Sequence, residues 1–192
     1  MNLKIFTQED FDAIPRDEDG WKRCPTGNYT RIKLFPAKCK FGPRSVFGSY
    51  SIFENYIVFG NECRLGTGCQ VGRNCHFGNS CWFDDRCEFE EFCELGNNCR
   101  LGDYCLAGCE FWLGFGCKLG DFCELDADCQ VGDDCSFGFG CELGSGCKVG
   151  ANCQIGNHSK LGDNCLLGVG WKLGDNCLLG DNCQLVGVEE TA

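Results

Sequence analysis

Two stretches, Leu161-Gly162-Asp163-Asn164-Cys165-Leu166 and Leu173-Gly174-Asp175-Asn176-Cys177-Leu178, repeat one six-residue pattern. The pattern continues without a slip from Cys39 to Leu185. Cysteine fills 19 of the 25 sites that lie six residues apart from 39 to 183, and an apolar residue stands two positions after every site. The next position is mostly glycine, followed by a pair rich in Asp, Asn, Gly and Ser. Such a regular short period identifies a repeat protein.

Each hexad predicts three extended residues that point inward, outward and inward, followed by a turn in which glycine adopts conformations closed to other residues. A hexad is too short for a hairpin or a helix. We therefore expect three hexads to form one coil, whose strands pair in parallel with those of the next coil. The fold class is all-β, a solenoid of about eight coils and roughly 40 Å in length at 4.7–4.9 Å per coil.

These hexads resemble the repeat of the hexapeptide superfamily of left-handed parallel β-helices, which reads aliphatic, Gly, two free positions, a small residue and a free one. The resemblance covers about three quarters of the chain. The Cys-x-Phe/Leu-Gly form is similar to cysteine-rich hexapeptide proteins of bacteria and prophages. The resemblance implies left-handed winding. The superfamily includes acyltransferases, γ-class carbonic anhydrases and purely structural members.

The two ends of the chain differ from the repeats. Residues 1–38 predict an N-terminal cap, with a short helix over 7–13, a turn at 25–27 and an extended segment over 29–34, because a bare solenoid end exposes apolar interior and unpaired strand edges. Residues 39–185 form the β-helix, and residues 186–192 form a C-terminal tail.

Composition and charge narrow the function. Asp and Glu outnumber Lys and Arg by 28 to 17, for a net charge of −11, which favours a basic partner and argues against direct binding to nucleic acid or to an anionic membrane. No apolar run has transmembrane length, and the N-terminus lacks a signal-peptide core. We expect a cytoplasmic protein of a bacterium or of a phage that infects one.

The 21 cysteines are best explained as structural thiols. Nineteen stand at the inward position that the superfamily fills with small residues, where Cys acts as a small buried hydrophobe. Disulfides between equivalent positions of adjacent coils and metal binding are the alternatives, but the spacing is not that of a zinc site. We expect no metal and no cofactor. Cys24 and Cys109 are out of phase, and Cys109 falls at a turn.

The sequence predicts no catalytic residue. His76 and His158 are the only histidines, and the separation between them corresponds to more than four coils, about 20 Å. A general base must lie within hydrogen-bond reach of its target, and the uninterrupted frame leaves no loop for a pocket. A hexapeptide-type acyltransferase acting as an oligomer is the alternative.

Outward residues are assigned to faces by adding 18, the length of three hexads, and they favour a structural or protein-binding role. One face is acidic and could mimic nucleic acid toward a host protein; a solvated, solubility-giving face is the other reading. A second face runs through Arg64, Trp82, Arg100 and Lys118. Exposed apolar residues predict a homo-oligomer, either a dimer through the C-terminal coils or a side-by-side trimer, or a host protein partner. The predicted acidic residues are Asp85, Glu88, Glu90, Glu91, Glu124, Asp126, Asp128 and Glu142. The predicted interface residues are two aromatic groups and two leucines of the C-terminal coils: Phe92, Trp112 and Phe115 together over adjacent coils, Tyr104, Phe122 and Phe139 at another corner, and Leu166 and Leu178.

Overall fold

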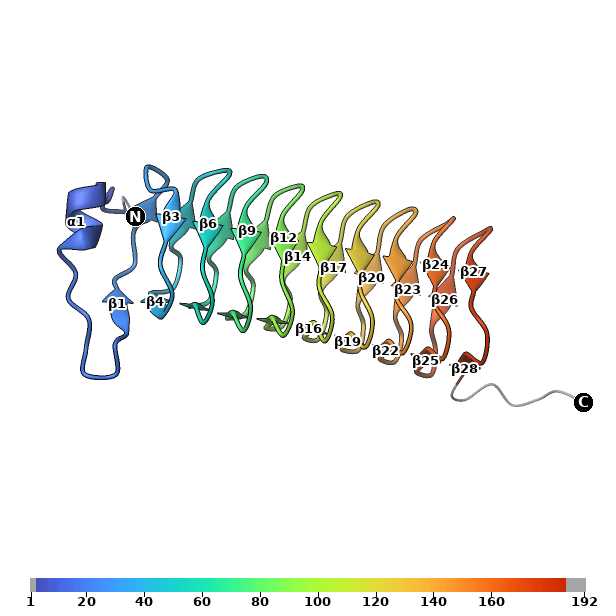
Figure 1. Ribbon diagram of the computed structural model, residues 1–192. Coiled ribbons are helices and arrows are strands. Elements are labelled where there is room, and N and C mark those ends of the chain that lie inside the picture. Colours follow the sequence, from blue (N-terminus) through green and yellow to red (C-terminus); the bar gives the residue numbers. More distant parts are fainter. Residues whose placement is uncertain (1–2, 186–192) are drawn as a thin grey trace, which may run out of the picture.

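The computed structural model describes residues 3–185, which form a straight solenoid of about nine coils (Figure 1). Each coil contributes one short strand to each of three parallel sheets, and each strand lies beside the equivalent strand of the next coil. His76, for example, pairs with Glu94 and Phe77 with Leu95. In most strands the first residue points outward and the second inward, as the hexad predicts. The all-β parallel solenoid with three hexads in each coil is therefore confirmed.

The strands are short and regular, and their bounds follow sheet by sheet. Sheet 1 contains β1 (Lys22–Cys24), β4 (Cys39–Phe41), β7 (Val58–Phe59), β10 (His76–Phe77), β13 (Glu94–Leu95), β16 (Trp112–Leu113), β19 (Gln130–Val131), β22 (Lys148–Val149), β25 (Leu166–Leu167) and β28 (Gln184–Leu185). Sheet 2 contains β2 (Asn28–Tyr29), β5 (Val46–Phe47), β8 (Arg64–Leu65), β11 (Trp82–Phe83), β14 (Arg100–Leu101), β17 (Lys118–Leu119), β20 (Ser136–Phe137), β23 (Gln154–Ile155) and β26 (Lys172–Leu173). Sheet 3 contains β3 (Leu34–Phe35), β6 (Ile52–Phe53), β9 (Gln70–Val71), β12 (Glu88–Phe89), β15 (Leu106–Ala107), β18 (Glu124–Leu125), β21 (Glu142–Leu143), β24 (Lys160–Leu161) and β27 (Leu178–Leu179).

The three sheets begin at residue 22, ahead of the hexads. β1 pairs with β4, β2 with β5 and β3 with β6, so residues 22–38 form a first coil beneath the repeats. The extended segment expected over 29–34 is instead two strands separated by a turn. This coil lacks the cysteine pattern because Gly27 and Lys33 stand where the next coil has Ser45 and Ser51.

The N-terminal end is closed by α1 (Gln8–Asp12), the short helix expected over 7–13 (Figure 1). The Thr7 side chain accepts the N–H of Asp10, and the Asp10 carboxylate accepts the N–H of Thr7, which is a capping box. Phe11 is buried against Phe35, with ring centres 5.5 Å apart. The buried Lys22 ammonium donates to the carbonyl of Phe11 at 2.7 Å, which attaches the helix to the first coil.

The core is filled by the inward apolar residues and the cysteines. The N-terminal coils contain stacked aromatic rings, such as Phe35 on Phe53 at 4.7 Å, and the later coils contain mainly leucine and valine. Many thiols donate to a backbone carbonyl of the preceding coil; Cys99 Sγ lies 3.4 Å from the Gly78 oxygen. Packed side chains fill the interior, and the thiols make these weak hydrogen bonds. Among the described residues, every buried side-chain oxygen or nitrogen has a hydrogen-bond partner.

The turns are joined by ladders of Asn and Asp side chains. In each ladder a side-chain oxygen accepts the backbone N–H of the equivalent residue in the next coil, so the turns of successive coils are hydrogen-bonded to each other as the strands are. The acceptors are Asn55, Asn61, Asn79, Asp85, Asn97, Asp103, Asp121, Asp133, Asn157 and Asp163.

The glycine after each inward apolar residue is required by close approach of the coils. A Cβ at Gly120 would come within 2.7 Å of the Gly102 carbonyl carbon one coil earlier. Such a distance is not tolerated without movement of the backbone, which explains why this hexad position is mostly glycine.

The tail expected at 186–192 lies outside the described residues. Within residues 3–185, no helix is long and apolar enough to cross a bilayer.

Candidate functional site

Carboxylates collect along sheet 3 and along the turns that lead from sheet 3 to sheet 1. We name these residues the acidic surface: Glu54, Glu88, Glu90, Glu91, Glu124, Asp126, Asp128 and Glu142. All are exposed except Glu91, which is half-buried. The backbone pairing of every coil fixes their spacing along the solenoid, so the surface is rigid before any partner binds.

Three of these acids occupy the position that is glycine in most hexads. Glu54, Glu90 and Asp126 alternate with Gly72 and Gly108 on successive coils. Two coils correspond to about 10 Å, so these carboxylates repeat at that distance along one edge of sheet 3. The row they form lies next to the outward residues of sheet 3.

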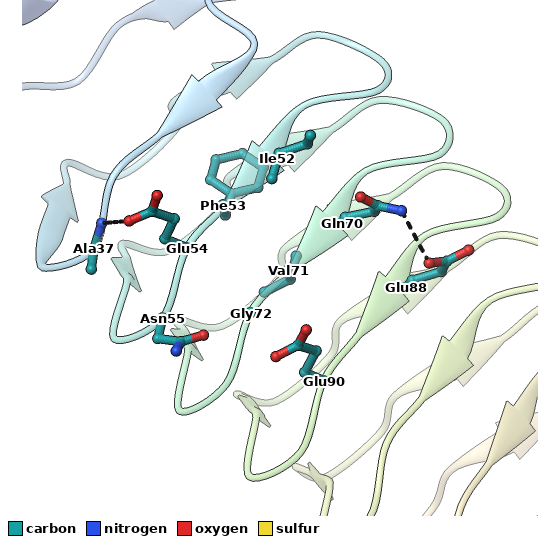
Figure 2. A pocket seen from close by; sticks show the side chains of 10 residues that line it. All are labelled: Ala37, Ile52, Phe53, Glu54, Asn55, Gln70, Val71, Gly72, Glu88 and Glu90. Carbon is teal, nitrogen blue, oxygen red and sulfur yellow. Dashed lines mark hydrogen bonds between the residues drawn. The ribbon is translucent and has the colours of Figure 1, made fainter.

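A shallow groove runs over the N-terminal part of this surface (Figure 2). It has a volume of about 400 Å³, and Glu54, Glu88 and Glu90 line it together with Ile52 and Gln70. Glu54 accepts the N–H of Ala37 at 3.0 Å, and Glu88 accepts the amide of Gln70 at 3.3 Å. Two of its three carboxylates are therefore oriented by neighbouring donors.

Few cations neutralise the acidic surface. Arg73 lies 3.5 Å from Glu90 and 3.4 Å from Glu91, and Lys160 lies 2.6 Å from Glu142. The Glu142 carboxylate raises the pKa of Lys160. Within residues 3–185, no basic group lies within 4.0 Å of the carboxylates of Glu124, Asp126 or Asp128. The surface therefore keeps a net negative charge.

Asp85, which the sequence places with these acids, has a different position and a visible structural contact. It lies in the turn between sheet 2 and sheet 3, at the opposite edge of sheet 3 from Glu90 and Asp126. Its Oδ1 accepts the N–H of Asp103 at 2.9 Å, so it is a member of a turn ladder.

The predicted aromatic residues separate into two groups. Tyr104 and Phe122 stack with ring centres 5.2 Å apart, and Phe139 lies 5.4 Å from Phe122. Arg86 covers the free face of Tyr104 at 5.9 Å, and His158 lies 5.0 Å from Phe139. The rings of this corner cluster thus contact one another, although each side chain stays exposed.

Phe92 and Trp112 form the second group and line one hollow of about 250 Å³ over sheet 1. Phe115, which was expected beside them, lies in the turn on the other edge of sheet 1 and does not line this hollow. Leu166 and Leu178 lie on different faces, because β25 belongs to sheet 1 and β27 to sheet 3.

One histidine in this hollow has a carboxylate partner. His76 Nδ1 lies 3.0 Å from an oxygen of Glu94 on the next coil. Because an ionised carboxylate only accepts, Nδ1 carries the proton and Nε2 is left as the acceptor of the neutral ring. Both side chains are about half exposed, and the hollow does not exclude water.

The cysteines are all free thiols, and most stand in columns beside the sheets. The neighbouring thiol of Cys117 and burial raise the pKa of Cys135 to about 12, and the same two causes, with Cys135 as the neighbour, raise the pKa of Cys153. Cys109 is half-buried at a turn. In residues 3–185, no three His, Cys, Asp or Glu side chains are grouped so as to hold a metal ion.

The stacking of Arg64 and Arg100 on Trp82 was not predicted. Their guanidinium carbons lie 4.7 and 5.0 Å from the centre of the indole. The signal was present, because these residues take the same outward position in successive coils, which places them side by side on one face.

Comparison of the chain with protein-family models, with curated proteins and with solved structures gives no significant match.

Proposed function

We propose that the protein is a non-catalytic scaffold that binds a basic protein through the acidic surface. The observation that carries the proposal is that Glu124, Asp126 and Asp128 have no cation within 4.0 Å among residues 3–185. A fixed array of like charges attracts a partner of opposite charge and accelerates its association. The regular backbone holds the array in place, so a partner loses little free energy in ordering it.

The partner class that best fits is a nucleic-acid-binding protein. The binding site of such a protein carries basic residues along a line, and the acidic surface presents carboxylates along the line of a rigid solenoid. The protein would then occupy such a partner as a mimic of DNA or RNA, without binding nucleic acid itself. We propose that the chain does this as a bacterial or phage protein acting on a host protein in the cytoplasm, and that it belongs to the hexapeptide-repeat superfamily. The free thiols support a reducing compartment.

A capture experiment tests this proposal. Tagged protein is incubated with bacterial lysate, and the retained proteins are identified by mass spectrometry with and without duplex DNA as competitor. We expect nucleic-acid-binding proteins, displaced by DNA and lost with the triple variant Glu90→Gln, Asp126→Asn, Asp128→Asn. The matched control is Asp19→Asn, Asp134→Asn, Asp175→Asn, which removes the same charge elsewhere. The same proteins on both variants, or no competition by DNA, would contradict mimicry.

Self-association is part of the proposal. Leu178 is 62% exposed, and the inward residues Leu179 and Leu185 of the last described coil are more exposed than their counterparts in earlier coils. A dimer through these coils and a side-by-side trimer both cover apolar surface of this kind. Native mass spectrometry distinguishes them, and a monomer at all concentrations contradicts both.

The His76–Glu94 pair favours one second candidate, an acyltransferase-like activity of an oligomer. A histidine oriented by a carboxylate through Nδ1 has the arrangement of a general base, with Nε2 as the reacting atom. Acetyl transfer from acetyl-CoA to amine and alcohol acceptors is the test. Activity abolished by His76→Ala and retained by His158→Ala would support an enzyme; no turnover by the native chain would remove this candidate.

A further inference from the structure

A row of cations with one indole runs along the outside of sheet 2. Arg64, Trp82, Arg100 and Lys118 take the outward positions of the consecutive strands β8, β11, β14 and β17. Both guanidinium groups stack on the indole, at 4.7 and 5.0 Å. Stacking restricts the two arginines and leaves the N–H groups at the guanidinium edge for an anion.

The cations of this row have no acidic partner within the described chain. Across residues 3–185, no carboxylate oxygen lies within 4.0 Å of the charged nitrogens of Arg64, Arg100 or Lys118. The sequence contains 28 acidic residues and 17 basic ones, so a row of cations without a neighbouring carboxylate means that the charges are segregated on the surface. An anionic surface is the partner that such a row fits.

A complementary row lies on sheet 3 of the same molecule. Glu88, Leu106, Glu124 and Glu142 take the outward positions of the consecutive strands β12, β15, β18 and β21, and all four are exposed. The order is acid, apolar, acid, acid, where sheet 2 has cation, indole, cation, cation. Each member follows its counterpart in the chain by one full coil and the step from sheet 2 to sheet 3.

We propose that sheet 2 of one copy packs on sheet 3 of a second copy, with the two solenoids parallel and shifted by one coil. The contact joins Arg64 to Glu88, Trp82 to Leu106, Arg100 to Glu124, and Lys118 to Glu142 of the second copy. Both rows have the same rise because they belong to the same continuous coil. Once one level is in place, the other three match without any adjustment.

Other alignments of the same two faces match less well. Without the shift, Trp82 faces Glu88 and Arg100 faces Leu106, so only Lys118 meets an acid. In an antiparallel arrangement centred on Trp82 and Leu106, Lys118 faces Gln70. The parallel, shifted contact is the one of these three that gives every cation of the row a carboxylate.

The contact uses two different surfaces and includes a shift along the axis. A head-to-tail contact of this kind does not close into a ring, and it extends into an open array. It uses Glu88, Glu124 and Glu142 of the acidic surface but not Glu90, Asp126 or Asp128. The triple variant Glu90→Gln, Asp126→Asn, Asp128→Asn therefore tests the binding of a basic protein without removing this contact, so the two proposals can fail independently.

Two charge variants test the contact. The first, Arg100→Glu with Lys118→Glu, gives the molecule two acidic faces, and the second, Glu124→Lys with Glu142→Lys, gives it two basic faces. Sedimentation velocity is measured for each variant, for their equimolar mixture and for the native chain over a range of concentrations. We expect the native chain and the mixture to associate progressively, and each variant alone to remain monomeric.

Cysteine pairs test the shift. Gln154 and Leu178 stand in the same relation as the four contacts, and Gln154 and Lys160 would meet only without the shift. We expect a mixture of Gln154→Cys and Leu178→Cys copies to cross-link under mild oxidation several-fold faster than a mixture of Gln154→Cys and Lys160→Cys copies.

Four outcomes overturn the proposal. A native chain that is monomeric at every concentration rules out the contact, and so does association that both charge variants retain. Faster cross-linking of the unshifted pair rules out the register. A native monomer that binds heparin or single-stranded DNA through Arg100 and Lys118 would assign the row to a polyanion instead.

Discussion

The Oδ1 atom of Asp103 accepts the backbone N–H of Asp121, one coil further along the solenoid, at 2.8 Å. This bond needs an acceptor oxygen but no charge. We therefore expect Asp103→Asn to leave the free energy of unfolding nearly unchanged and Asp103→Ala to lower it by about 1 kcal/mol, the usual contribution of such a bond. Urea unfolding followed by circular dichroism gives both values. Equal losses in the two variants would mean that the ladder depends on the carboxylate charge.

The Cys135 thiol contributes stability that is lost at alkaline pH. Cys135 Sγ donates to the Gly114 carbonyl at 3.3 Å, which only the protonated thiol can do, and the Cys117 thiol and burial raise the pKa of Cys135 from 9.0 to about 12. The unfolded chain releases this proton near pH 9 and the folded chain only near pH 12, so the contribution is present below pH 9 and falls between these values. Thermal unfolding measured from pH 7 to 11 should show a constant difference in Tm between the native chain and Cys135→Ala up to about pH 9 and a smaller difference above it. A difference that grows above pH 9 would contradict the direction.

Burial also predicts which cysteines react. Cys109, Cys177 and Cys183 are half-buried, while the other cysteines are buried. Iodoacetamide at pH 8 should label these three first in the folded protein and all 21 only after unfolding in denaturant. Peptide mapping by mass spectrometry provides the readout. Cysteines that resist labelling in denaturant until a reductant is added would instead reveal disulfides.

The Lys22 side chain predicts a separable cap. Its ammonium donates to the carbonyls of Phe11 and Asp12 at 2.7 and 3.3 Å and lies 4.6 Å from the Phe11 ring centre. Lys22→Met keeps the aliphatic stem and removes these bonds, so we expect a loss of about 2 kcal/mol and faster hydrogen exchange in α1. Lys148→Met, on the exposed face of β22, is the control. Unchanged exchange in α1 would show that apolar packing alone holds the cap.

Replacing Gly140 by alanine should lower the free energy of unfolding for two reasons. Its φ is 66°, and a Cβ there would lie 2.8 Å from the Phe122 ring. Gly140→Ala should lower the free energy of unfolding by about 1–2 kcal/mol from the left-handed backbone alone, and further because the ring must move. Gly20→Ala, at a φ of 78° and with no atom closer to the added Cβ than the Lys38 nitrogen at 4.0 Å, measures the backbone component. Equal losses in the two variants would show that Phe122 moves freely.

Most of the fold was predictable because every hexad has the same local pattern of residues. An inward Cys, an outward residue, an inward apolar residue and a close-packed glycine fix the strand, the turn and the coil length together. The first coil was not predictable in this way, because Tyr29 and Phe35 fill its interior without the cysteine pattern. Its pairing with the repeats depends on contacts between residues distant in sequence.

The surface was predictable in position but not in contacts. Adding 18 placed Tyr104 above Phe122 and Arg64 beside Trp82, and these neighbours are confirmed. The same arithmetic cannot tell whether a turn Asp points outward or toward the next coil, so Asp85 was grouped with the acidic residues although its oxygen belongs to a ladder. Phe115 was misplaced because Phe92 precedes the sheet 1 strand of its coil whereas Phe115 follows it, so the two rings lie at opposite edges of that sheet.

Each strand pairs only with its counterparts in the coils before and after it, so the coils are equivalent structural units. Removing one coil shortens the solenoid by about 4.8 Å and leaves every remaining coil with the same kind of neighbour on each side. The row of cations on sheet 2 and the row of carboxylates on sheet 3 belong to the same series of coils. Deleting or duplicating a coil outside these rows therefore moves both rows by the same distance. Length can therefore change during evolution by copying a segment of DNA that encodes one coil, while the relation between the two rows is inherited intact.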